Sequence, residues 1–108
     1  MSLALQVGRR FRQRLEALLG EHLVELRLFG SRVRGDAHAE SDLDVFVLVD
    51  SDEAAWLAPV VGEASALLLE MELPFALCPL VMDVEHYGDL KDREVRLARD
   101  LETEGVPI

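Results

Sequence analysis

Cysteine is nearly absent from this sequence, and so are long apolar segments. Cys78 is the single cysteine, so the chain cannot form an internal disulfide. The apolar runs are short, such as Phe75–Met82, which has eight residues and contains Pro79, whereas a membrane-spanning helix needs about 18 or more. The first residues also lack the apolar core of a secretory signal. We therefore expect a protein of the reducing cytoplasm that does not enter a membrane.

Basic residues are scarce as well. The chain has 11 Lys and Arg against 21 Asp and Glu, which gives a net charge of −10. Such a surface repels a polyanion, so we do not expect direct binding of nucleic acid, and a basic protein is the better candidate partner. The three histidines, at positions 22, 38 and 86, are too far apart in sequence for a local zinc motif.

Apolar residues, by contrast, are abundant enough to form a core. They make up 50% of the 108 residues, so we expect one domain spanning residues 1–108. Hydrophobic periodicity and turn residues predict six elements in an α+β fold, a small mixed sheet with helices packed on it. These elements are a helix from Leu3 to near Gly20, strands at Val24–Gly30 and Leu43–Val49, a helix from Ser51 to about Met71, a strand at Phe75–Met82 and a helix at Leu90–Glu104.

Alternation within the first two strands predicts which side chains share a face. In the first strand, Val24, Leu26 and Leu28 form the apolar side. In the second, one face has Leu43 and the valines at 45, 47 and 49, and the other has Asp42, Asp44, Phe46 and Leu48.

Two features of the middle helix concern where it begins. Ser51 has the residue type and position of an N-cap, with acidic residues in the turn that follows. Pro59 either kinks the helix or makes the main helix begin near residue 58, and both alternatives remain open from the sequence.

Asp42 and Asp44 are the candidate metal ligands. Two residues apart on a strand, they share a face with their Cα atoms about 7 Å apart. If their oxygens approached to about 4 Å, the repulsion would be roughly 4 kcal/mol at an effective dielectric of 20, which a divalent cation would relieve. Carboxylate ligands favour Mg²⁺ or Mn²⁺. The alternative is that both side chains lie in solvent at the sheet edge without a function.

A turn upstream of these aspartates is typical of phosphate binding. Gly30 and Ser31 end the first strand, and ten residues separate Ser31 from Asp42. Glycine lets backbone N–H groups approach an anion closely, and the serine adds a hydroxyl donor. Arg34 follows in the same loop and either contacts a phosphate or is solvated. A metal-bound triphosphate would fit between this turn and the carboxylates.

The run FGSRVRG at 29–35 followed by DLD at 42–44 resembles the signature of minimal nucleotidyltransferases in the polymerase-β-like superfamily. In particular, it resembles the antitoxin type that pairs with a HEPN toxin. The resemblance implies a polymerase-β-like core and transfer of AMP from ATP to a tyrosine of the toxin. It also implies that Gly30 and Ser31 hold the β- and γ-phosphates, while the two aspartates hold Mg²⁺.

One departure from that pattern concerns a third carboxylate, which many relatives carry on the next strand. The aligned position here is Cys78, and Asp83 is the nearest acid that follows in the sequence. Either an acid such as Asp83 substitutes or the third ligand is missing. A catalytically silent module that binds a nucleotide and neutralises a toxin therefore remains an alternative. A transferase acting on a small molecule is a further one, although the chain has no second domain to form its pocket.

Overall fold

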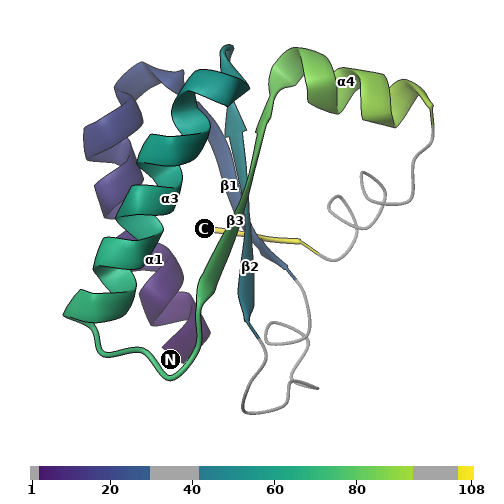
Figure 1. Cartoon of the computed structure of the whole chain (residues 1–108). Coiled ribbons are helices and arrows are strands. Elements are labelled where there is room, and N and C mark those ends of the chain that lie inside the picture. The colour runs from purple at the N-terminus through teal and green to yellow at the C-terminus, as the bar shows by residue number, and fades with distance from the viewer. Residues whose placement is uncertain (1–2, 30–41, 94–104) are drawn as a thin grey trace.

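We describe the protein from a computed structural model, over residues 3–29, 42–93 and 105–108 (Figure 1). The described residues form a sheet in the strand order β3-β2-β1-β4, with helices on both of its faces. Its elements are α1 (Leu3–Leu19), the short 3₁₀ turn η1 (Gly20–His22), β1 (Leu23–Phe29), β2 (Leu43–Val49), α3 (Glu53–Glu70), β3 (Leu77–Asp83), α4 (Val84–Asp92) and β4 (Val106–Pro107).

The sheet is mixed, as predicted. Strand β1 is antiparallel to both β2 and β4, whereas β2 and β3 are parallel. Parallel neighbours require a crossover connection, and α3 provides it between β2 and β3. The α+β fold class predicted from the sequence is therefore confirmed.

Helices α1 and α3 lie on one face of the sheet, and α4 lies on the other (Figure 1). The first face holds the larger core, where the alternate β2 residues Leu43, Val45, Val47 and Val49 pack with residues of α1 and α3. Opposite them, Phe46 and Leu48 pack with Met82 and Tyr87. The predicted division of β2 into two faces is thus confirmed. We call the side that carries Phe46 and Leu48 the α4 face.

The predicted alternation of β1 is wrong at its first residue. Val24 is 51% exposed, whereas Leu26 and Leu28 are buried. The cause is a bulge, because Leu23 pairs with Val49 while Glu25 already pairs with the adjacent Leu48. The extra residue in β1 turns Val24 away from the core.

Helix α3 begins one residue later than a Ser51 cap predicts. Its N-cap is Asp52, in the left-handed region at φ 61° and without a side-chain cap. The Asp52 carbonyl accepts from the amides of Ala55 and Trp56, at 2.9 and 3.2 Å. Ser51 instead donates its hydroxyl to a carboxylate oxygen of Asp50 at 3.3 Å. The helix runs continuously through Pro59, so it does not begin near residue 58.

The C-terminal part of the fold departs most from the prediction. Strand β3 begins at Leu77 rather than Phe75, and α4 follows it directly. Within the predicted helix Leu90–Glu104, the first residues belong to α4, and residues 94–104 lie outside the described part of the chain. Strand β4 was not predicted. No helix in the described ranges combines the length and apolar character needed to cross a bilayer.

Candidate active site

The α4 face carries a row of three side chains close to the N-terminal end of β2. In the sheet register, Asp44 pairs with Phe29 of β1 on one side and with Cys78 of β3 on the other. Paired residues project from the same face of a sheet. The chain also leaves β1 at Phe29, so the segment containing the predicted turn starts opposite Asp44. The predicted phosphate-binding residues Gly30, Ser31 and Arg34 themselves lie outside the described residues.

Asp42 lies just before β2 and contacts Cys78 as well. Its carboxylate accepts a hydrogen bond from the Cys78 thiol, with 3.3 Å between Oδ2 and Sγ. Asp42 is exposed, whereas Asp44 is half-buried. Partial burial and the negative charge of Asp42 raise the pKa of Asp44 above its usual value. The two carboxylates are therefore close enough to interact, and the thiol lies beside both.

The Cys78 thiol keeps its proton at physiological pH. Burial, the hydrogen bond to Asp42 and the charges of Asp42 and Asp44 raise its pKa to about 11. A nucleophilic cysteine needs the opposite, a lowered pKa. Cys78 therefore contributes a neutral donor at the position where the family resemblance places a carboxylate.

Asp83 lies too far along the sheet to replace that carboxylate. It pairs with Val49, five residues after the Asp44–Cys78 pair, which corresponds to about 16 Å along the strands. There it caps α4 by accepting from the His86 amide at 2.9 Å, while its own amide donates to Glu53 at 2.8 Å. The sequence left the position of Asp83 open, and the register gives it a structural role.

The donor set around Asp42 suits a cation that needs few protein ligands. Within residues 3–29, 42–93 and 105–108, no group of three or more His, Cys, Asp or Glu side chains is arranged to hold a metal ion. Mg²⁺ is commonly bound by one or two carboxylates, together with water and substrate phosphates. Asp42 and Asp44 fit such a shared site, and they do not form a closed cage of protein ligands.

Comparisons with known proteins give these carboxylates a context. A family model described as the nucleotidyltransferase domain matches residues 9–102. The chain belongs to this family. No curated protein matches the sequence significantly.

Two solved structures share the fold of this nucleotidyltransferase domain. A candidate nucleotidyltransferase from Sulfolobus solfataricus is 20% identical, with a TM-score of 0.52 over 96% of this chain and 78% of that one. The second is a chain in the crystal structure of a toxin–antitoxin with AMP-PNP. Its sequence is 22% identical to this one, and the TM-score is 0.53, with 91% of this chain and 69% of that one covered. At these identities the likeness concerns the fold.

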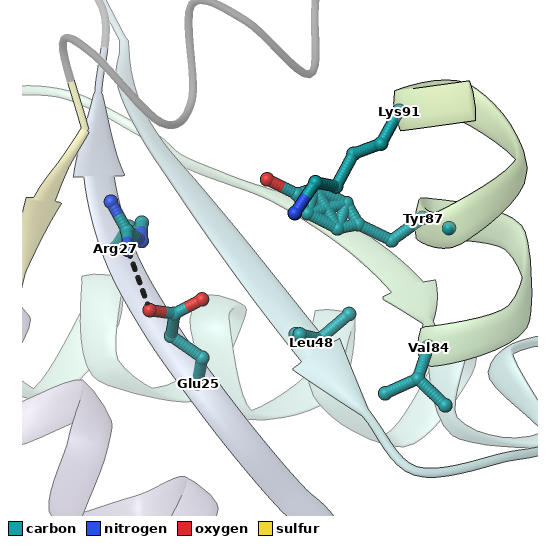
Figure 2. A pocket seen from close by; sticks show the side chains of 7 residues that line it. Glu25, Arg27, Leu48, Val84, Tyr87 and Lys91 are labelled. Atoms are coloured by element: carbon teal, nitrogen blue, oxygen red, sulfur yellow. Dashed lines mark hydrogen bonds and ion pairs between the residues drawn. The ribbon is translucent and has the colours of Figure 1, made fainter. Parts of the chain in front are cut away.

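The nucleotidyltransferase domain also has a pocket that sequence reasoning missed. About 350 Å³ in volume, it lies between the sheet and α4 (Figure 2). The strand register places its β1 and β2 residues on the same face as Asp44. Its lining includes Glu25 and Arg27 of β1, Leu48 of β2, and Tyr87 and Lys91 of α4. The alternation of β1 places Glu25 and Arg27 on one face, but the pocket over them also requires the part of α4 before Leu90, which was not predicted as helix.

Proposed function

We propose that this protein transfers a nucleoside monophosphate, AMP from ATP, to a hydroxyl of a protein partner. We further propose that the partner is a HEPN-type toxin, that the acceptor is one of its tyrosines, and that the protein acts in the cytoplasm as the antitoxin. The observation that carries the proposal is the interacting pair Asp42 and Asp44 at the N-terminal end of β2, in a chain of the nucleotidyltransferase family.

The reaction forms one bond and breaks one. The acceptor hydroxyl oxygen bonds to the α-phosphorus of ATP, and the bond from that phosphorus to the oxygen bridging to the β-phosphate breaks. Pyrophosphate leaves with the bonding electrons, and the hydroxyl proton passes to a base or to water. The products are an AMP ester on the partner, pyrophosphate and a proton.

Asp42 and Asp44 are the residues that we propose hold the cation, Mg²⁺ or Mn²⁺, with the phosphates supplying further ligands. The bound cation would supply positive charge to offset the charge that develops on the phosphate oxygens. Gly30, Ser31 and Arg34 are proposed to hold the phosphates through backbone amides, a hydroxyl and a guanidinium.

Two features favour a protein as the acceptor. The fold is shared with a toxin–antitoxin structure, and the net charge of −10 is suited to attract a basic protein. A second candidate function is a silent module that binds a nucleotide and neutralises the toxin by contact alone. Cys78, a neutral thiol beside Asp44, is the observation that favours it. A small-molecule acceptor is a third possibility, and nucleotide binding at the aspartates would be common to all three.

Intact-mass spectrometry of the partner tests the proposal directly. After incubation with Mg-ATP and this protein, the partner should gain about 329 Da for each AMP transferred. Asp44→Asn should abolish the gain, whereas Glu21→Gln, which removes an exposed acid on η1, should not. If the wild type gives no adduct with ATP, CTP, GTP or UTP while the toxin is still neutralised, the silent module is the correct function.

A further inference from the structure

The pocket beneath α4 is built from two different kinds of wall. On one side β1 contributes Glu25 and Arg27, whose carboxylate and guanidinium are 2.7 Å apart. On the other side α4 contributes Tyr87, with the Lys91 ammonium 5.6 Å from the centre of its ring. Leu48 lies between them, as Figure 2 shows. The pocket is therefore partly apolar, and a carboxylate lies on the β1 side.

Strand register gives the position of this pocket relative to Asp42 and Asp44. Arg27 pairs with Phe46, two residues from Asp44 and thus about 7 Å along the strand. Glu25 pairs with Leu48, four residues from Asp44 and about 13 Å along it. A ribose and a base that extend from a phosphate at the aspartates would cover this distance along the α4 face.

The chemistry of the lining favours a base over a second phosphate. The volume of about 350 Å³ lies at the small end of the range for ligand pockets. The Glu25 carboxylate repels a phosphate and offsets the charge of Arg27, while the Lys91 ammonium lies over the Tyr87 ring, 5.6 Å from its centre. The same carboxylate accepts several hydrogen bonds, so it can accept one from an exocyclic amino group. Leu48 and the Tyr87 ring supply apolar surface for a planar ring.

We propose that this pocket binds the nucleobase of the nucleotide, and that Glu25 selects bases that carry an exocyclic amino group. This inference rests on the proposed function, because it takes the phosphates to lie at Asp42 and Asp44. It makes the pocket a specificity site, separate from the carboxylates that face the phosphates.

Filling the pocket from Gly88 tests the assignment. Gly88 lines the pocket in α4, and a Cβ added there meets no atom within 4 Å. Gly88→Leu should therefore occupy the pocket without a clash at Cβ, and leucine favours a helix more than glycine does. The matched control is Gly62→Leu in α3, where an added Cβ also meets no atom within 4 Å and the helix covers the opposite face (Figure 1).

Calorimetric titration with Mg-ATP and with Mg-tripolyphosphate separates base binding from phosphate binding. We expect Gly88→Leu to weaken ATP binding by roughly tenfold or more, to leave tripolyphosphate binding unchanged, and to keep the wild-type thermal transition. Gly62→Leu should change neither affinity. Equal affinities of the wild type for ATP and tripolyphosphate would overturn the base pocket alone. Failure of the wild type to bind either would overturn the proposed nucleotide site as well.

The role of Glu25 is tested with ATP and purine riboside triphosphate, which differ only in the exocyclic amino group. The wild type should bind ATP roughly tenfold more tightly than purine riboside triphosphate, as for a hydrogen bond to a charged group. Glu25→Leu should remove this preference, whatever it does to either affinity alone. An unchanged ratio would overturn the assignment of Glu25. If Gly88→Leu leaves ATP binding intact but slows transfer to the partner, the pocket holds the acceptor and the base assignment is wrong.

Discussion

Repulsion between Asp42 and Asp44 is the physical basis of the candidate active site, and it can be measured in the protein without metal. Asp44 has a raised pKa because of its burial and the nearby charge of Asp42. Each of the variants Asp42→Asn and Asp44→Asn removes one of the two charges and keeps the size of the side chain. Both single variants should therefore be more stable than the wild type when no cation is present.

The magnitude of the repulsion between Asp42 and Asp44 follows from the strand geometry. With charges about 7 Å apart, the repulsion lies between roughly 0.6 kcal/mol at the dielectric of water and roughly 2.4 kcal/mol at an effective value of 20. Asp42 is exposed and Asp44 half-buried, so we expect about 1 kcal/mol. In a domain of this size that corresponds to a rise in Tm of about 4–8 °C. Asp44→Asn also relieves the burial of a charged group, so it should gain more than Asp42→Asn. Since one repulsion is shared, the gain of the double variant should fall short of the sum of the two single gains by about this 1 kcal/mol.

Urea unfolding of the four proteins in EDTA at pH 7 measures this coupling, with Glu21→Gln as the control for a loss of net charge. High salt should reduce the coupling, because exposed charges are screened. The free energy of unfolding should depend on pH in a definite direction. A carboxyl whose pKa is higher in the folded state than in the unfolded state stabilises the fold at low pH, and this stabilisation is lost as the pH rises through the folded-state pKa. The gain from Asp44→Asn should therefore be present at neutral pH and disappear in acid. Additive gains in the double variant would show that the two carboxylates do not interact.

Three further outcomes follow from the same structure. Mg²⁺ or Mn²⁺ with ATP should raise the Tm of the wild type by mass action, and the double variant Asp42→Asn/Asp44→Asn should lose this rise. An unchanged rise in the double variant would show that the two aspartates do not bind the metal and nucleotide. Association with the cognate toxin should slow several-fold in stopped-flow measurements between low and physiological salt, and salt-independent rates would mean that the acidity does not guide binding. Leu26→Ala should lower the free energy of unfolding by about 2–5 kcal/mol and Val24→Ala by less than about 0.5 kcal/mol, whereas similar losses would contradict the bulge.

The strands could be predicted where their side chains alternate regularly. Strand β2 is apolar on one face and carries Asp44 on the other, so its period of two predicts both the core and the carboxylates. The prediction that Val24 is buried is wrong because a bulge depends on the pairing between two strands, and the pattern within one strand does not contain that information. The two-residue strand β4 is too short to have a period, and it forms only by pairing with β1.

The pocket was missed for a similar reason. Helix α4 has nine residues and begins directly after β3, so the apolar pattern of the strand runs into the helix without a turn signal. The one local indication is Asp83, which caps the helix through its side chain. The lining of the pocket comes from three separate elements, β1, β2 and α4, and only the fold brings them together.

Cys78 determines the charge of the candidate site. A third carboxylate at this position, one strand away from Asp44, would add repulsion of roughly 3 kcal/mol at a separation of about 5 Å and an effective dielectric of 20. The thiol, with its pKa of about 11, avoids this cost and donates a hydrogen bond to Asp42. The described part of the site thus has a formal charge of −2, which a single divalent cation balances. The described part of the site offers no third carboxylate beside Asp44 to accept the proton of an attacking hydroxyl, so in the proposed reaction another base or water takes that proton. The complex with the partner holds the acceptor together with this site, and it is therefore the form in which transfer should be measured.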